Sequence, residues 1–250
     1  MEQRGTLVVT GGSRGVGAEV CIEAAARGWD VAVNYVLDAG AASRVVAQIQ
    51  SAGGRALAIR ADVAEPADVA GLFQTAESEL GPIRGLVNNA GISGGFARVD
   101  ELESAALARV LAVNVAGAFA CAGEAVRRMS SRHGGSGGAI VNISSRAARL
   151  GSPGEWVHYA ASKAALDTLT VGLAREIATE GVRVNAVALG LVDTDFHAAA
   201  GEPTRPERIR PTVPMQRSGT AAEVAEAVLW LLSDAASYTT GTVLAVSGGR

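Results

Sequence analysis

Short apolar runs alternate along the chain with longer segments whose apolar positions recur at helical spacing. Runs of this length, bounded by glycine and polar residues, are typical of strands buried on both faces of a parallel sheet. We predict strands at Thr6–Thr10, Asp30–Tyr35, Arg55–Arg60, Gly85–Asn88, Ala139–Ser145, Arg183–Gly190 and Thr242–Val246. Helices are predicted at Ala18–Arg27, Ala41–Ala52, Val69–Leu80, Ala105–Arg128, Tyr159–Leu166 and Thr220–Leu232.

This alternation predicts an α/β fold in which a doubly wound, seven-stranded parallel sheet carries helices on both faces. No second domain, linker or repeat interrupts the pattern, so residues 1–250 are expected to form one domain. The segment Phe196–Arg217 lacks a regular period and contains four prolines, which are Pro203, Pro206, Pro211 and Pro214.

Composition narrows the class of protein. The chain is 48% hydrophobic but only 4% aromatic, which predicts a sizeable aliphatic core. A formal charge of −3 without a long Lys/Arg cluster argues against a nucleic-acid surface. Cys21 and Cys121 are too few for a disulfide framework, and His133, His158 and His197 lack metal-ligand spacing. With no signal-peptide pattern and no apolar run near the roughly 20 residues of a membrane span, we expect a cytoplasmic protein without a membrane partner.

A glycine-rich turn follows the first predicted strand and leads into a helix. It contains Gly11, Ser13, Arg14, Gly15, Val16 and Gly17. A strand, a glycine turn and a helix N-terminus in this order form an anion site, because backbone N–H groups and the helix dipole point at the ligand, which is typically a pyrophosphate. The spacing is G-x-x-x-G-x-G, whereas the commoner dinucleotide pattern is G-x-G-x-x-G. Taken alone, the turn is also consistent with a generic tight turn of an α/β domain.

The end of the second strand bears on the choice of cofactor. In dinucleotide folds an acidic residue there binds the adenosine ribose hydroxyls, whereas this chain has Asn34 and Tyr35. Neither repels a 2′-phosphate, and Arg14 is placed to neutralise one, so we favour NADP(H) over NAD(H). Two observations argue the other way: Arg14 suits a solvated turn, and Asp38 lies close by.

Two further strand ends carry candidate cofactor contacts. Asp62, followed by Val63, is placed either to accept a hydrogen bond from the adenine amino group or to cap the next helix. Asn89, Ala90 and Gly91 open the turn after the fourth strand, where asparagine side chains satisfy turn groups and glycine permits a close backbone approach.

Tyr159 and Lys163 lie four residues apart on an Ala-rich helical segment, so their side chains share one helix face. An ammonium beside a phenol favours the phenolate, and we therefore expect Lys163 to lower the pKa of Tyr159 from its usual value of about 10. A tyrosine tuned in this way exchanges a proton near neutral pH. On its own, such a pair is far more typical of an ordinary helix surface than of a catalytic site.

Ser145 ends the fifth predicted strand, at the edge where open α/β sheets bind ligands. Ser144 and Ser145 point to opposite faces of an extended strand, so only one can face a ligand. Asn114 lies inside the long predicted helix, where asparagine is unfavourable, so a kink or a water site is expected there. An exposed asparagine at a small cost in stability is the alternative.

These motifs together resemble the classical short-chain dehydrogenase/reductase family over essentially the whole chain. The similar features are T-G-x-x-x-G-x-G at 10–17, N-N-A-G at 88–91, Asn114, Ser145 and Y-x-x-x-K at 159–163. Within the family, the segment Arg149–Glu155 resembles the glucose-1-dehydrogenase-like or 3-oxoacyl-carrier-protein-reductase-like branch. One departure is Leu189 before Gly190, where the family usually has proline, which puts the rigidity of that turn in question.

The resemblance implies a single-domain Rossmann fold and a role for each motif. Asn114, Ser145, Tyr159 and Lys163 would be catalytic, with Lys163 also binding the nicotinamide ribose and Asn114 linking it to solvent through a water. The family commonly uses the later of two adjacent serines, which favours Ser145. The spacing to Tyr159 is one residue longer than usual and keeps Ser144 in contention.

The resemblance also assigns the remaining contacts. Gly190, Val192 and Thr194 would hold the nicotinamide carboxamide, and residues 191–217 would form a mobile lid over the substrate. His158 is expected to be a pocket wall or an exposed ring rather than a catalytic base.

The function implied is hydride transfer between NADP(H) and a small molecule that interconverts a carbonyl and a secondary alcohol. The alternatives are an NAD-dependent sugar or alcohol dehydrogenase and a dinucleotide-binding sensor without chemistry. A homotetramer, or a homodimer, is expected by analogy with the family.

Overall fold

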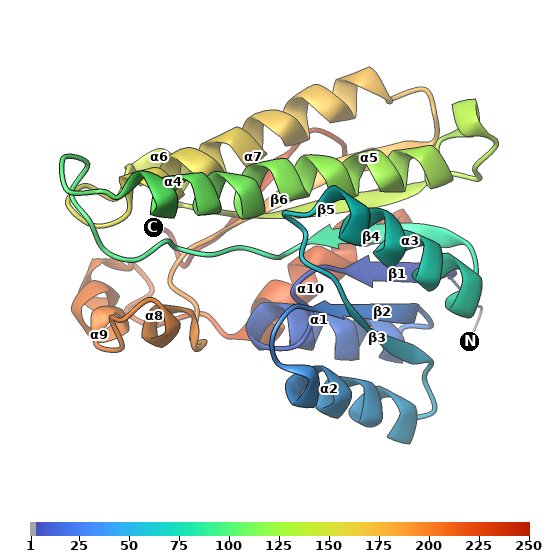
Figure 1. Cartoon of the computed structure of the whole chain (residues 1–250), viewed down its shortest axis with the longest axis horizontal. Helices are drawn as coiled ribbons and strands as arrows, with labels where there is room; N and C mark the ends of the chain where they lie inside the picture. The colour runs from blue at the N-terminus through green and yellow to red at the C-terminus, as the bar shows by residue number, and fades with distance from the viewer. Residues whose placement is uncertain (1–3) are drawn as a thin grey trace.

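The structure, a computed structural model, describes residues 4–250. Its strands form one parallel sheet of seven strands in the order β3-β2-β1-β4-β5-β6-β7 (Figure 1). The strands are β1 (Thr6–Val9), β2 (Asp30–Tyr35), β3 (Ala56–Arg60), β4 (Ile83–Asn88), β5 (Gly138–Ser145), β6 (Val182–Leu189) and β7 (Val243–Val246). The predicted seven-stranded α/β fold is confirmed, and the strand order reverses between β1 and β4, where such sheets bind ligands.

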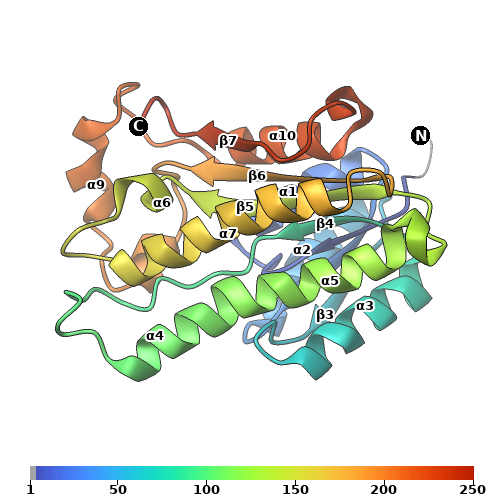
Figure 2. The same cartoon turned by 90° about the horizontal axis from the view of Figure 1, so that it is seen from above.

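Helices cover both faces of this sheet (Figure 2). On one face are α1 (Gly15–Ala26), α2 (Ala39–Ser51) and α10 (Ala221–Leu232). On the other are α3 (Pro66–Leu80), α5 (Ala118–Met129) and α7 (Val157–Glu176). The strand side chains alternate accordingly, because Leu7 and Val9 pack with the first set of helices and Val8 packs with the second. Both cores are mainly aliphatic, as the composition predicted.

Several helices begin earlier than the apolar pattern predicted. The first begins at Gly15 rather than Ala18, and the third begins at Pro66 rather than Val69. Proline suits the first helical turn because an N–H there has no partner within the helix. At the start of α10, Thr220 and Glu223 form a capping box in which each side chain accepts a hydrogen bond from the other's backbone N–H.

The long predicted helix that contains Asn114 is interrupted at that residue. It comprises α4 (Ser104–Leu111), a π-helical turn η1 (Ala112–Gly117) and α5. Contrary to the expectation from the sequence, the segment Ser104–Met129 is long and apolar enough, by length and composition alone, to cross a bilayer. In the structure α5 packs against β4 and α3, so the apolar side of α5 lies in the core of the domain.

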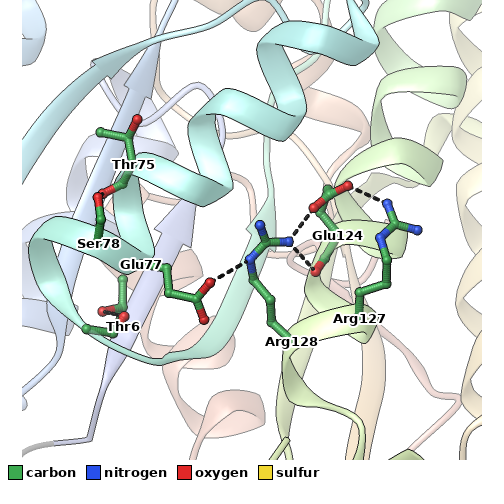
Figure 3. A network of polar contacts seen from close by, with 8 residues as sticks. Thr6, Thr75, Glu77, Ser78, Glu124, Arg127 and Arg128 are labelled. Carbon is green, nitrogen blue, oxygen red and sulfur yellow. Dashed lines mark hydrogen bonds and ion pairs between the residues drawn. The ribbon is translucent and has the colours of Figure 1, made fainter. Parts of the chain in front are cut away.

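An ion-pair network joins α3 to α5 near the amino ends of the strands (Figure 3). Nε of Arg128 lies 3.1 Å from a carboxylate oxygen of Glu77 on α3, and Arg128 also pairs with Glu124, as does Arg127. Burial alone would raise the pKa of Glu124, but the hydrogen bonds from Arg127 and Arg128 lower it overall. The network stabilises the packing of two helices at the edge of the sheet opposite the predicted site.

The segment Phe196–Arg217, predicted to be irregular, contains two short helices, α8 (Phe196–Ala199) and α9 (Arg205–Ile209). They lie beyond the carboxyl ends of the central strands, beside the loop that leads into α7 (Figures 1 and 2). The remaining short elements are α6 (Ala147–Leu150), η2 (Ser131–His133), η3 (Arg210–Thr212) and η4 (Asp234–Ala236).

Candidate active site

The strand β5 delivers two serines to the carboxyl edge of the sheet, and they face opposite ways. The Ser145 hydroxyl accepts a hydrogen bond from the backbone N–H of Ala147 at 3.1 Å. It also lies close enough to the Tyr159 hydroxyl to favour a lower pKa of that phenol. The Ser144 hydroxyl is buried and bonds to the Asp167 carboxylate and to the Lys163 backbone carbonyl. Ser145 is therefore the serine that the structure places beside Tyr159.

Tyr159 and Lys163 lie one turn apart near the start of α7, and both are buried. The ammonium nitrogen of Lys163 donates to the backbone carbonyl of Ile143 at 2.7 Å and lies 5.7 Å from the centre of the Tyr159 ring. The strand β5 thus fixes both the serine and the lysine that accompany the tyrosine.

The predicted lowering of the Tyr159 pKa by Lys163 is wrong for this structure. Burial raises the pKa of Tyr159 to about 12 and outweighs the opposing effects of the Ser145 hydrogen bond and the Arg205 charge. Burial also lowers the pKa of Lys163 to about 8, against the attraction of Asp167. At neutral pH the phenol is therefore protonated, and the lysine still carries its charge.

Asn114, in the π-helical turn, is held close to this group. Its carboxamide oxygen accepts from the N–H of Ile92 at 2.9 Å, and its nitrogen donates to the carbonyl of Ile92 at 2.9 Å and to the Ser162 hydroxyl at 3.0 Å. A Cβ added to Gly91 would lie 3.4 Å from Nζ of Lys163 and 3.5 Å from Oδ1 of Asn114. The backbone of the N-N-A-G turn therefore runs directly beside both predicted catalytic side chains.

The glycine turn after β1 and the N-N-A-G turn after β4 are bound to each other. Nδ2 of Asn89 donates to the carbonyl oxygens of Thr10 and Gly11 at 3.0 and 2.9 Å. The Thr10 hydroxyl accepts from the N–H groups of Asn89 and Ala90. A Cβ on Gly17 would lie 2.4 Å from the carbonyl oxygen of Gly11, so no larger residue fits there without a shift.

This turn fits the pyrophosphate of a dinucleotide. The helix α1 begins directly after Arg14, whose side chain does not cap the helix. The first backbone N–H groups of α1 can therefore donate hydrogen bonds to a bound phosphate. Gly15, with a φ of +54°, lies beside Thr194, whose methyl carbon would be 3.5 Å from an added Cβ. The glycine turn, predicted to hold the pyrophosphate, and the segment after β6, predicted to hold the nicotinamide carboxamide, therefore meet here.

The predicted ribose and adenine contacts have structural partners of their own. Asn34 is fully buried; its side chain accepts from the N–H of Gly11 at 3.1 Å and donates to the carbonyl of Ala61 at 2.9 Å. It therefore shapes the glycine turn from behind, while the partly exposed Tyr35 lies at the strand end. Asp38 caps α2 by accepting from the N–H of Ala41 at 2.8 Å.

Asp62 is not the cap of the next helix, contrary to one of its two predicted roles, and its carboxylate is held by a backbone N–H and an arginine. One carboxylate oxygen accepts from the N–H of Ala64 at 3.0 Å, and the other pairs with Arg109 of α4 at 2.7 Å. Burial raises the Asp62 pKa, but these hydrogen bonds lower it overall. The cap of α3 is Glu65, without a side-chain hydrogen bond, and Val63 is buried beneath the turn. Arg109 could not be predicted, because no local pattern links it to Asp62.

The turn after β6 is firmly held despite Leu189. This leucine pairs with both neighbouring strands, and its carbonyl accepts from the N–H of Arg146 at 2.8 Å. The next N–H, that of Gly190, donates to Val246 at 2.9 Å, and a Cβ on Gly190 would lie 2.6 Å from Cα of Ser247. Val192 forms a bridge with Gly219. Backbone pairing therefore supplies the rigidity that a proline would otherwise give.

An aromatic cluster, absent from the candidate residues, surrounds Tyr159. Trp156 is its buried centre and meets the rings of Phe96, Tyr159 and Phe196 at 4.9, 5.9 and 5.9 Å between ring centres. His197 stacks on Trp156 at 5.8 Å. Only the scarcity of aromatic residues could have drawn attention to Trp156 and Phe96, because the two lie far apart in the sequence. The cluster forms an apolar wall beside the predicted proton donor.

The two histidines near the site, His158 and His197, are both buried. Burial, followed by the neighbouring Arg205 charge, lowers the pKa of His197 to about 4, so its ring is neutral. His158 is buried with its Nε2 unpaired, and a Cβ on Gly94 would lie 3.0 Å from that nitrogen. Of the two roles expected for His158, the structure places it as a wall packed against the turn after β4.

Comparison with known proteins shows similarity along the whole chain. A family model described as enoyl-(acyl carrier protein) reductase matches residues 11–250. An uncharacterized oxidoreductase of Escherichia coli (strain K12), YgfF, is 49% identical over 97% of this chain and 98% of its own. A 3-oxoacyl-[acyl-carrier-protein] reductase of Staphylococcus aureus, FabG, is 36% identical over 100% of this chain and 99% of its own.

Solved structures agree with this result. A mutant short-chain dehydrogenase/reductase of Serratia marcescens superposes with a TM-score of 0.91 and is 37% identical, covering 99% of this chain and 98% of its own. A blue fluorescent protein from a metagenomic library, solved in complex with NADPH, gives a TM-score of 0.90 at 34% identity, covering 99% and 98%.

Proposed function

The chain belongs to the short-chain dehydrogenase/reductase family and is an oxidoreductase acting on carbonyl and alcohol groups, and we propose that it interconverts a ketone and a secondary alcohol with a preference for NADP(H). The observation that carries the proposal is the meeting of the Ser145 hydroxyl, the Tyr159 phenol and the Lys163 ammonium at the carboxyl edge of the sheet, beside the glycine turns. The FabG relative favours the 3-oxoacyl-carrier-protein-reductase-like branch over a glucose-1-dehydrogenase-like one.

In this mechanism the bound nicotinamide supplies the hydride when a carbonyl is reduced. Ser145 donates a hydrogen bond to the carbonyl oxygen, and Tyr159 gives its proton to the same oxygen as negative charge develops there. Because the pKa of Tyr159 is raised to about 12, the phenol holds its proton until negative charge develops on the substrate oxygen. Phe96, Trp156 and Phe196 exclude water on one side of the reacting carbonyl.

Lys163 and Asn114 complete the proposed catalytic set. The Lys163 ammonium, held by Ile143, would bind the nicotinamide ribose, and its positive charge near the Tyr159 ring stabilises the phenolate that remains when the tyrosine gives up its proton. All hydrogen bonds of the Asn114 carboxamide go to Ile92 and Ser162, so we assign the solvent relay to a water at the backbone carbonyls of the π-helical turn. The side chain of Asn114 then positions the Gly91 backbone.

The NADP(H) preference rests on charges around the end of β2. Arg14 is exposed at the start of α1, and Arg60 donates from Nε to the carbonyl of Val36 at 3.2 Å. A Cβ on Gly40 would lie 3.6 Å from Nη1 of Arg44, which puts a third guanidinium near this strand end. Three cations and one capping carboxylate, Asp38, favour a 2′-phosphate.

The alternative hypothesis, an NAD-dependent dehydrogenase, requires that Asp38 repel the 2′-phosphate of NADP(H). Equilibrium binding of NADPH and NADH separates the two, and we expect Arg14→Gln to reduce the NADPH preference. A clear preference of the unmodified protein for NADH would contradict the cofactor proposal.

Turnover tests the reaction itself. We expect NADPH oxidation with members of a panel of ketones, quinones and oxo-esters, and loss of nearly all turnover in Tyr159→Phe with NADPH binding retained. Binding of NADPH without turnover of any panel member by the unmodified protein would instead support the non-catalytic sensor. Retained turnover in Tyr159→Phe would refute the catalytic role of the tyrosine.

We also propose that the protein is a cytoplasmic homotetramer or homodimer. The free thiols of Cys21 and Cys121 fit a reducing compartment. Leu111 and Phe119, about two turns apart on the α4–α5 segment, expose 41% and 52% of their surface, which suits a helix-pairing interface. Light scattering should show an oligomer that Phe119→Glu dissociates, while Leu37→Glu, at an exposed turn, leaves it intact.

A further inference from the structure

A groove of about 370 Å³ lies between the loop that precedes α7 and the helix α9. Three arginines line it, Arg205, Arg208 and Arg250, and Glu155 is the one acidic residue among the lining side chains. Leu150 and Ile209 supply apolar walls. None of these residues has a part in the proposed proton transfer or in cofactor binding.

The arginines of this groove outnumber its carboxylate. One oxygen of Glu155 accepts from Nε and Nη2 of Arg205 at 3.0 and 2.7 Å, and the other lies 2.7 Å from Nη2 of Arg208. Arg205 is almost fully buried, whereas Arg208 is more than half exposed. The bidentate pair with Glu155 holds the Arg205 side chain in place. Arg208 contacts Glu155 through Nη2, so its other N–H groups remain available to a ligand.

Arg250 adds a third guanidinium to the groove. Within residues 4–250 its guanidinium forms no ion pair, and its backbone carbonyl is held by Nε of Arg146 at 2.6 Å. Burial, followed by repulsion from Arg205, lowers its pKa. Like charges gathered around a single carboxylate favour the binding of a further anion.

One wall of the groove, formed by Arg205, packs against the aromatic cluster that borders Tyr159. The guanidinium carbon of Arg205 lies 4.1 Å from the centre of the Trp156 ring, and that ring lies 5.9 Å from the centre of the Tyr159 ring. These two distances place Arg205 within about 10 Å of the Tyr159 ring. Trp156 therefore contacts both Tyr159 and the framework of the groove, and a substrate tail that extends past this ring would meet the arginines.

We propose that this groove binds an anionic group at the far end of the substrate, a carboxylate, sulfonate or phosphate, with Arg208 and Arg250 as its direct contacts. The inference rests on the proposed function, because it names the substrate class as carbonyl compounds with a negatively charged tail. Glu155 and Arg205 form the framework that holds Arg208 in place, and Trp156 spaces the anion from the carbonyl.

A matched pair of substrates tests the proposal. In 7-oxooctanoate a ketone is joined by a methylene chain to a carboxylate, and its methyl ester has the same length without the charge. We expect kcat/KM with NADPH to be at least about tenfold higher for the acid, which corresponds to one charge-assisted hydrogen bond. Arg208→Gln and Arg250→Gln should each bring the ratio of acid to ester close to one. Arg210→Gln, at an exposed neighbour outside the groove, should leave the ratio unchanged.

The outcomes separate this inference from the proposed activity. Equal use of acid and ester by the unmodified protein overturns the anion site and leaves the reductase standing. Calorimetry with the acid and the ester provides a readout independent of turnover: tighter binding of the acid, lost in Arg208→Gln, supports the site even if neither compound is reduced. Equal affinities overturn it. Thermal unfolding of each variant, expected to match the unmodified protein, identifies any that fails to fold.

Discussion

The two serines at the end of β5 provide the sharpest test of the catalytic assignment, because they are adjacent in sequence and opposite in role. Ser145 lies beside the Tyr159 hydroxyl, whereas Ser144 is 1% exposed and bonds to Asp167 beneath the helix. Ser145→Ala removes one donor from the developing oxyanion, a change that costs about 10²–10³ in kcat in comparable sites. Ser144→Ala leaves the geometry of Tyr159 in place.

The stability of the two variants should differ in the opposite direction. Ser144→Ala deprives the half-buried Asp167 carboxylate of a hydrogen-bond donor, which we estimate to cost about 1–2 kcal/mol of unfolding free energy. At about 2–4 °C per kcal/mol for a chain of this size, the midpoint of thermal unfolding should fall by several degrees. Ser145→Ala, at a partly exposed strand end, should change it little.

The assay combines steady-state NADPH oxidation with thermal unfolding monitored by circular dichroism. A large loss of kcat in Ser144→Ala together with nearly normal kcat in Ser145→Ala would reverse the assignment. Large and equal losses in both would show that the strand end acts as a unit, and the argument from opposite faces would then be wrong.

Three further changes probe other parts of the structure. Gly17→Ala should weaken NADPH binding at least about tenfold and lower the midpoint of thermal unfolding, because the added carbon would lie 2.4 Å from the Gly11 carbonyl oxygen. The control Gly172→Ala, at a position with open space around it, should be neutral or slightly stabilising. Equal NADPH affinities of the two variants would contradict the steric argument. Lys163→Met should abolish turnover yet raise the free energy of unfolding at pH 7 by roughly 1–3 kcal/mol. Because the pKa of Lys163 is about 8 in the folded state and about 10.5 in the unfolded state, this gain should shrink as the pH rises from 8 past 10.5. A gain that does not change with pH would exclude burial of the charge as its cause. Glu124→Gln should lower the free energy of unfolding at pH 7, measured with urea, by about 1 kcal/mol. Because the pKa of Glu124 in the folded protein lies below its usual 4.5, this loss should disappear as the pH falls through the folded pKa. A loss that persists in acid would rule out the ion pair as its origin.

The features that the sequence predicted well are those set by local chemistry. Glycine spacing predicted the turn after β1, and the structure shows why Gly17 must be glycine, because it contacts the backbone of the same turn. The end of an apolar run placed Ser145 at the carboxyl edge of β5. Asn114, as a poor helix former, predicted the departure from α-helical geometry that appears as the π-helical turn.

The features that the sequence could not predict depend on contacts between distant segments. Asp62 meets Arg109, and Trp156 meets Phe96 and Phe196, through packing that no local pattern encodes. The helices α8 and α9 were missed because each is too short to display a period. The Tyr159 pKa was misjudged for a related reason, since a pairwise argument from Lys163 omits the burial that the whole fold imposes.

Burial of Tyr159 and Lys163 explains the pKa shifts of both side chains and the role we propose for them in proton transfer. Each shift moves a side chain toward its neutral form, upward for the Tyr159 pKa and downward for that of Lys163, because both groups lie in the apolar interior at the start of α7. The phenol therefore keeps its proton until charge develops on an oxygen held by Ser145, and Asp167 opposes the effect of burial on the Lys163 ammonium, which is bound to Ile143. A surface tyrosine and lysine with the same spacing would lack this coupling, so the strand β5, which buries and bonds both partners, matters as much to the chemistry as the spacing of the motif.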